Sequence, residues 1–180
     1  GMDGFLKALP NANFPFLCAN YDFSDTELNG RTEVYRVFQK GNTKIGVFGI
    51  GVELDGLVSP DLYKGTQYKD PVKAAQKIAD KLRNDYQCNL VVCLPHLGYF
   101  ARLNDMCDTV LASETRNIDL IIGGHTHTFM PQAEMHKNKD GNPVLINQVG
   151  WAGLVLGRID FYFYKKGNPD LYTSYTLNTN

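Results

Sequence analysis

Two apolar runs separated by a helical pattern constrain the fold of this chain most strongly. The runs are Lys44–Ile50 and Asn89–His96, and the segment between them, Asp70–Tyr86, has apolar residues at helical spacing. Asp70 suits the N-cap of that helix, and Pro71 suits its first position. A strand–helix–strand order predicts a right-handed crossover and a parallel sheet. The sequence therefore predicts an α/β fold.

The other segments are expected to extend this unit. A helix over Leu103–Thr115 should lead into a third strand, Asp119–Ile122, and a short helix is expected over Gly4–Leu9. A turn at Lys40–Thr43 and another at Lys166–Pro169 match hairpin signals. The further strands expected are Phe14–Tyr21, Val34–Gln39, Gln132–Lys137, Val144–Val149, Leu154–Tyr164 and Tyr172–Leu177.

Composition excludes several classes of protein. The 180 residues suit one domain, and a hydrophobic content of 43% argues against wholesale disorder. With 18 Lys and Arg against 19 Asp and Glu, the charge does not fit binding to a nucleic-acid polymer. No apolar run reaches the roughly 20 residues of a membrane span, and Gly1-Met2-Asp3 does not open a signal peptide. The four cysteines form no CxxC pair, and we expect them to be small buried hydrophobes rather than disulfides or ligands.

Histidines follow two of the predicted parallel strands. His96 ends one strand, and Gly123-Gly124 connects another to His125 and His127. Carboxyl ends of parallel strands share one edge of the sheet, where ligands collect. In extended backbone the imidazoles of His125 and His127 would project to the same side and could clamp a metal ion, with the glycines serving a sharp turn. A loop that merely contains histidines is the alternative, and His136 is expected to be an ordinary surface residue.

Two motifs in this order resemble those of calcineurin-like metallophosphoesterases, and more closely those of the bacterial 5′-nucleotidase branch. They are Leu94–Tyr99 (LPHLGY) and Ile121–His127 (IIGGHTH). Further matching stretches are Phe16–Asn20, Lys44–Ile50, Asn147–Gly153 and Leu156-Gly157. The resemblance covers nearly the whole chain.

The resemblance implies a four-layer α/β/β/α sandwich and two divalent ions, Zn, Mn or Fe, that hydrolyse a small phosphomonoester such as a nucleotide. His96 and His125 would ligate one ion, and His127 the other. Tyr99 and Trp151 would line the substrate pocket, although packing roles explain them equally well. A periplasmic or extracellular location is also implied by the resemblance alone.

The family's N-terminal motifs are not in this sequence. They are an Asp-x-His pair, a Gly-Asp with the bridging aspartate, and a Gly-Asn-His-Glu/Asp loop that carries the histidine of the transition state. Only fifteen residues precede Phe16, and none is histidine. We therefore assign no catalytic residue and expect residues 1–180 to be a partial catalytic domain whose N-terminal part is missing. Asn20 is expected to make strand-end hydrogen bonds rather than to bind metal.

Three hypotheses follow from this departure. The first is a truncated phosphoester hydrolase, weak or inactive alone, that holds one ion or none. The second is a non-catalytic metal-binding or assembly module that self-associates or pairs with a missing N-terminal half, because the absent strands would leave an apolar face exposed. The third is a longer natural gene product.

Overall fold

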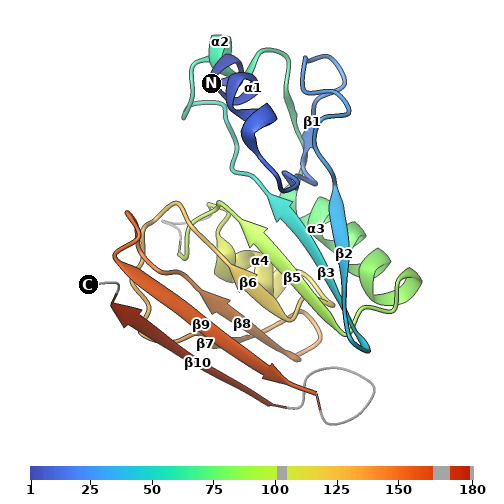
Figure 1. Ribbon diagram of the computed structural model, residues 1–180, viewed down its shortest axis with the longest axis vertical. Helices are drawn as coiled ribbons and strands as arrows, with labels where there is room; N and C mark the ends of the chain where they lie inside the picture. The colour runs from blue at the N-terminus through green and yellow to red at the C-terminus, as the bar shows by residue number, and fades with distance from the viewer. Residues whose placement is uncertain (101–104, 164–170, 179–180) are drawn as a thin grey trace.

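A six-stranded mixed sheet organises the computed structural model, which describes residues 1–100, 105–163 and 171–178 (Figure 1). The strand order is β2-β3-β5-β6-β8-β7, with the middle four parallel and the two edge strands antiparallel. This arrangement confirms the predicted parallel unit and hairpin. The strands are β2 (Tyr35–Lys40), β3 (Thr43–Ile50), β5 (Leu90–Pro95), β6 (Leu120–Ile122), β7 (Glu134–Lys137) and β8 (Pro143–Asn147).

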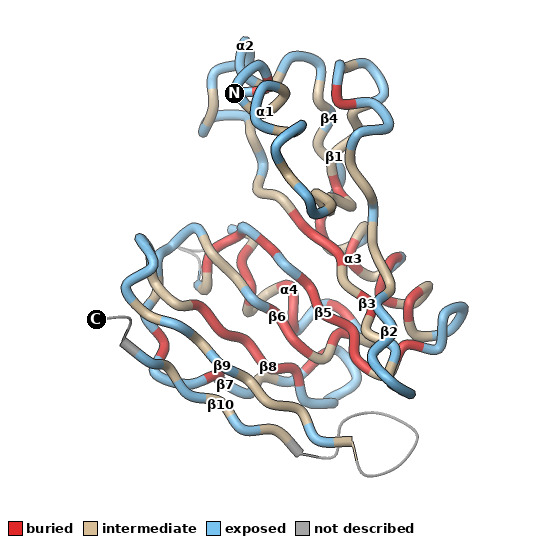
Figure 2. Tube along the Cα trace, in the orientation of Figure 1, coloured by how far each residue is buried: buried red, intermediate tan, exposed pale blue. Residues whose placement is uncertain are grey.

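Two helices cover one face of this sheet. They are α3 (Pro71–Asp80), which continues as a π-helical turn, η2 (Lys81–Asp85), and α4 (Asp108–Glu114). The Asp70 side chain accepts a hydrogen bond from the Lys73 amide at 3.0 Å, as expected for an N-cap. The larger core lies between these helices and the sheet (Figure 2). Its fully buried members include Phe48, Ala75, Ala79, Leu82, Val91, Cys93, Leu111, Ala112, Ile121, Val144 and Ile146.

A two-stranded antiparallel sheet covers part of the other face. It consists of β9 (Val155–Tyr162) and β10 (Leu171–Asn178). Its inward side chains pack on a smaller core that contains Leu90, Val92, Leu120, Ala133 and Leu145. The described residues therefore form three layers of the expected four: helices, a six-stranded sheet and a two-stranded sheet. Within this part of the chain, no helix lies on the outer side of β9 and β10 (Figure 1).

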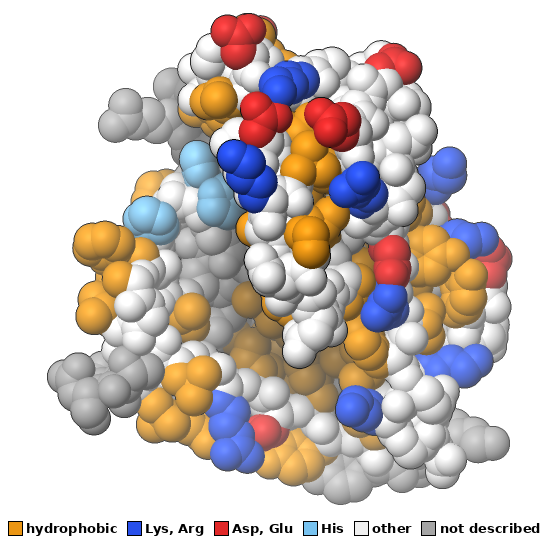
Figure 3. All heavy atoms as spheres, turned by 45° about the horizontal axis from the view of Figure 1, so that its top comes forward, with side chains coloured by type: hydrophobic (Ala, Val, Ile, Leu, Met, Phe, Trp, Pro, Cys, Tyr) orange, Lys and Arg blue, Asp and Glu red, His pale blue; other side chains and the backbone are white. Residues whose placement is uncertain are grey.

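The upper end of this second face is uncovered. Leu94 and Ile122 continue the inward pattern of Val92 and Leu120, but each is 41% exposed because the two-stranded sheet does not reach them. Figure 3 shows hydrophobic side chains at the bottom of a hollow beside the N-terminal lobe. In the described residues, β9 and β10 pair only with each other, so each has an edge without a strand partner.

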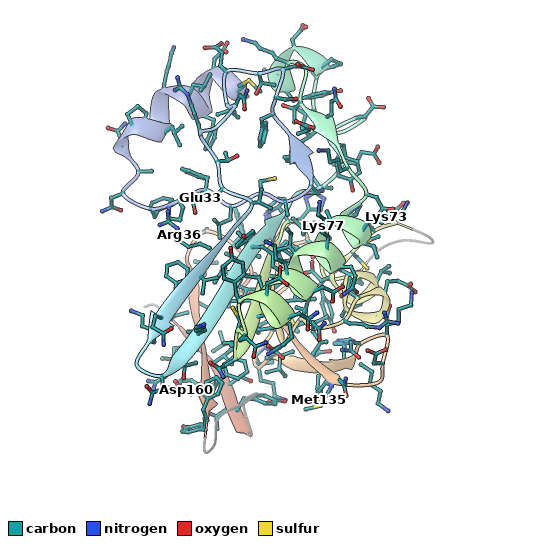
Figure 4. All side chains as sticks on the ribbon, turned by 90° about the vertical axis from the view of Figure 1, so that its right-hand side faces the viewer. Glu33, Arg36, Lys73, Lys77, Met135 and Asp160 are labelled. Carbon is teal, nitrogen blue, oxygen red and sulfur yellow. The ribbon has the colours of Figure 1, made fainter. Side chains whose placement is uncertain are left out.

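The N-terminal lobe stands beyond the carboxyl end of β3 (Figure 1). The two amide atoms of Asn20 bond to the backbone N–H and carbonyl of Gly51 at 2.7 and 2.8 Å, which confirms its predicted role. The lobe comprises α1 (Met2–Ala8), a 3-10 turn η1 (Leu9–Asn11), β1 (Tyr21–Asp22), α2 (Pro60–Tyr63) and β4 (Gln67–Tyr68). Figure 4 shows it from the side, above the helix-covered face of the sheet.

Some predicted boundaries are wrong. The strand expected over Phe14–Tyr21 is reduced to a bridge from Leu17 to Glu33 and the short β1, because its aromatic side chains form a cluster with Phe5 instead of a pleated face. The helix expected from Leu103 begins only at Asp108; residues 101–104 and the predicted turn at 166–169 lie outside the described residues. All four cysteines are free, and three are buried. No helix in the described ranges is long and apolar enough for a membrane crossing.

One carboxyl group is buried beneath the sheet edge. Asp108 is fully buried; its Oδ2 accepts a hydrogen bond from Gln148, whereas its Oδ1 has no partner. Burial raises the pKa of Asp108 to about 7, and the hydrogen bond from Gln148 opposes this shift. The folded state therefore favours the neutral acid in the range between its ordinary pKa of 3.8 and 7.

Substitution of neighbouring isoleucines tests the assignment of the two faces. Ile121→Ala should lower the free energy of unfolding by about 2–5 kcal/mol, because Ile121 is fully buried under the helices. Ile122→Ala, the matched control on the opposite face, should cost less than about 1.5 kcal/mol because that side chain already meets solvent. Urea unfolding measures both, and equal losses would contradict the layer arrangement.

Asp108 should make stability depend on pH. Since its folded pKa lies above the unfolded value, the native state binds the extra proton, and stability falls as pH rises from about 4 to about 7. The slope from this group is at most about 1.4 kcal/mol per pH unit. Asp108→Asn should therefore gain stability relative to wild type over that interval in urea unfolding at pH 4.5, 6.0 and 7.5. If the free energies of unfolding of wild type and Asp108→Asn change with pH in the same way, Asp108 does not titrate as expected.

Candidate metal centre

The carboxyl ends of β5 and β6 bring two histidines together. His96 follows β5, and His125 follows β6 after two glycines; the imidazole centroids lie 5.1 Å apart with the ring planes at 70°. Partial burial of its ring lowers the pKa of His96, and the neighbouring His125 and His127 lower it further. The neutral imidazole favoured in this way is the form that binds a metal ion.

The backbone of the histidine loop, residues 123–128, is not extended as predicted. His125 and His127 have φ of 74° and 53°, in the left-handed region that non-glycine residues seldom adopt. Their imidazoles consequently meet different partners. His125 lies against His96, whereas His127 stacks on Trp151 with centroids 5.9 Å apart and planes at 11°.

The glycines of both motifs provide space, and Gly123 and Gly124 do not serve the sharp turn expected of them. Neither Gly123 nor Gly124 has a positive φ, so no turn requires them. A Cβ at Gly123 would overlap the Asp108 carboxyl, and one at Gly124 would lie 3.1 Å from Nδ1 of His96. Gly98 has φ 94°, and a Cβ there would meet the Thr126 methyl at 2.7 Å. The glycines thus allow the two histidine motifs to pack against each other.

Sequence reasoning missed Asp108 and Gln148, which lie directly below the histidine loop. Gln148 follows β8 and is 1% exposed. Its amide donates to the Asp108 carboxyl at 2.8 Å and to the Gly124 carbonyl at 2.9 Å. The available signal was a glutamine inside the matching stretch Asn147–Gly153, next to a buried strand.

Tyr99 and Trp151 both lie near the histidines, at different sides. The Tyr99 amide donates to the Thr126 hydroxyl at 3.0 Å, and its own hydroxyl donates to Glu134. The same hydroxyl lies 3.3 Å from Nε2 of His136, which is therefore more than a simple surface residue. Trp151 is 58% exposed beside His127.

A cavity of about 390 Å³ separates the N-terminal lobe from the histidine loop. Its lining includes His125, Thr126 and Phe100 together with three carboxylates, Glu53, Asp55 and Asp105. Figure 3 shows pale-blue histidine side chains gathered beside the lobe. The volume is within the range of small-molecule sites. The carboxylates would repel a phosphate dianion unless cations accompany it.

The donor set fits part of a metal centre. The spacing of the His96 and His125 rings suits two imidazoles that face one ion. Among the residues that the structure describes, however, no group of three or more His, Cys, Asp or Glu side chains lies close enough to hold a metal. The pair therefore needs further ligands, from His127 after rearrangement or from outside these ranges.

Comparison with known proteins identifies relatives in sequence and in fold. No family model matches the chain. A snake venom 5′-nucleotidase from Gloydius brevicauda is 31% identical over 186 residues, which cover 93% of this chain and 30% of that protein. The trifunctional nucleotide phosphoesterase YfkN of Bacillus subtilis is 29% identical over 171 residues, 86% of this chain and 11% of YfkN. The chain thus spans a third or less of the length of these curated relatives.

Solved structures agree with the sequence relatives. The crystal structure of the 5′-nucleotidase precursor from Thermus thermophilus matches with a TM-score of 0.79 and 28% identity, over 96% of this chain and 35% of that one. The crystal structure of YfkN, described as a calcineurin-like phosphoesterase, matches with a TM-score of 0.74 at 24% identity, over 99% of this chain and 60% of that chain. These matches confirm the fold class, and the chain is a relative of the 5′-nucleotidases, which it matches over more than nine tenths of its own length.

Proposed function

We propose that this chain supplies part of the metal centre of a phosphomonoester hydrolase, with nucleoside monophosphates as the substrate class. The observation that supports this proposal most strongly is the pair of imidazoles from His96 and His125, which follow adjacent parallel strands. Membership of a family whose relatives are named 5′-nucleotidases supports the substrate class. An exported location is part of the same proposal.

His96 and His125 would hold one divalent ion, Zn, Mn or Fe, and His127 would contribute to a second. When bound, such an ion supplies a Lewis acid that withdraws charge from a phosphate oxygen. Lowering of the His96 pKa keeps the ring available as a ligand near neutral pH. In the cavity, the ions would also offset the carboxylates that otherwise oppose an anionic substrate.

Trp151 and Tyr99 have separate roles in this proposal. Trp151 offers an exposed aromatic face beside His127, suited to contact with the base or sugar of a nucleotide. Tyr99 joins the loop after His96 to β7 through Glu134, so it would shape the pocket wall. Because the described residues supply no group of three ligands, we expect weak or no hydrolysis from the chain alone.

The uncovered sheet face favours a second candidate function, that of an assembly module. Leu94 and Ile122 are exposed on the sheet face, and within the described residues β9 and β10 each have an edge without a strand partner. Burial of such a face against another polypeptide, or a second copy, would be favourable at about 25 cal/mol per Å². Metal binding without hydrolysis would fit both this candidate and a truncated hydrolase. Association through the uncovered face is what this candidate requires.

Metal titration tests the histidines directly. We expect the chain to bind Zn²⁺ or Mn²⁺, and His125→Ala to weaken that binding at least about tenfold, because an ion loses one of two facing imidazoles. His127→Ala should reduce the amount of bound metal. His136→Ala is the matched control and should bind as wild type does. Equal metal content in all four proteins, measured by calorimetry and elemental analysis, would refute ligation.

Hydrolysis of p-nitrophenyl phosphate tests the activity of the chain. With added Mn²⁺ or Zn²⁺ we expect little or no product, because the donor set of the described residues is incomplete. Any activity present should disappear with EDTA and in His96→Ala. Turnover at rates typical of an intact phosphatase would overturn the expectation of a weak site, and EDTA-resistant turnover would overturn the metal proposal.

A further inference from the structure

Gln148 uses the full hydrogen-bonding capacity of a primary amide. Its Nε2 donates to the Asp108 carboxyl at 2.8 Å and to the Gly124 carbonyl at 2.9 Å. Its Oε1 accepts from the Thr128 amide and from the Thr126 hydroxyl, both at 3.2 Å. Two donated and two accepted hydrogen bonds are the maximum that this side chain can make. The amide orientation is unambiguous because two acceptors face Nε2 and a backbone N–H faces Oε1.

Asp108 connects this glutamine to the other histidine motif. Its backbone N–H donates to the Gly98 carbonyl at 2.7 Å, two residues beyond His96. Its carboxyl occupies the space that Gly123 leaves free. Asp108 and Gln148 therefore contact the backbone of both segments that carry histidines, and both side chains are buried almost completely.

The histidine loop needs such support because its backbone is strained. A non-glycine residue in the left-handed region costs on the order of 1 kcal/mol, and His125 and His127 are both there. Only the surroundings can maintain this conformation. Of the side chains that bond to the loop from outside it, Gln148 reaches three of its residues: Gly124, Thr126 and Thr128.

We propose that Asp108 and Gln148 are a positioning pair that holds the histidine loop in the conformation in which His125 faces His96. This proposal rests on the proposed metal function for its purpose, although the geometry stands without it. A pair of buried polar side chains is a costly way to fill a core, since each must be desolvated. The benefit is a fixed direction for the middle of a loop whose two ends bond to the backbone of Asn147 and Gly150. Neither residue is expected to touch metal or substrate.

Amide hydrogen exchange of the 180-residue chain tests the pair without any metal. Gln148→Met keeps the volume but removes all four bonds, and exchange at Thr126 and Thr128 should become faster by about tenfold or more. Thr126→Val changes an exposed residue and should increase the exchange rate of the loop amides less than Gln148→Met does. Asp108→Asn keeps an acceptor for Gln148 and should preserve protection, whereas Asp108→Ala should not.

Gln76→Met is the matched control. Gln76 also bonds through both ends of its amide, to Asp80 and to the Arg116 N–H, but on the helix layer, and its variant should leave loop exchange unchanged. Unchanged loop exchange in Gln148→Met would overturn the proposal. If Gln148→Met increases amide exchange in the β2–β3 hairpin as much as in the loop, the proposal is also overturned. That pattern would indicate general destabilisation of the fold.

Zn²⁺ titration by calorimetry then separates this inference from the proposed function. If wild type binds Zn²⁺, Gln148→Met should weaken binding about tenfold and Asp108→Asn should retain wild-type affinity. Wild-type affinity in a Gln148→Met protein whose loop exchanges faster would overturn the positioning role. If wild type binds neither Zn²⁺ nor Mn²⁺, the proposed function fails, and the exchange data alone decide whether the pair holds the loop.

Discussion

Parallel pairing of β5 with β6 is the constraint on which the rest of the structure depends. Because the two strands run in the same direction, their carboxyl ends lie at one edge, and the residues that follow them must share a small space. His96 and His125 are those residues. The helices α3 and α4 maintain this register by covering one face of the sheet, so the location of the histidine pair follows from the packing of a core that contains no histidine.

Close contact of the two histidine motifs makes severe demands on the residues beneath them. Gly98, Gly123 and Gly124 are small where any side chain would displace a neighbour. Gln148 and Asp108 satisfy the polar backbone that the packing buries. The Asp108 carboxyl remains there with one oxygen unpaired and with its pKa raised by burial, and burial of such a group costs free energy.

Two features of the described residues lack partners, the histidine pair and one face of the six-stranded sheet. Within the described residues no third ligand joins His96 and His125, and the second face of the sheet exposes Leu94 and Ile122. Both features lie toward the carboxyl ends of β5 and β6. A polypeptide that covered the face would also approach the histidines. Covering the exposed face would therefore also change the surroundings of the histidine pair.

The sequence by itself determined the parallel unit, the helix cap at Asp70 and the strand ends at His96 and His125, because periodicity and end signals are local. The sequence also predicted correctly that Asn20 makes strand-end hydrogen bonds. It did not predict the left-handed backbone of His125 and His127, the stacking of His127 on Trp151, or the buried pair Asp108 and Gln148. The apolar run Phe14–Tyr21 was predicted to be a strand, whereas its aromatic side chains pack with Phe5 from a different segment. These features arise from contacts between segments far apart in the chain, and only tertiary packing decides which buried group finds which partner.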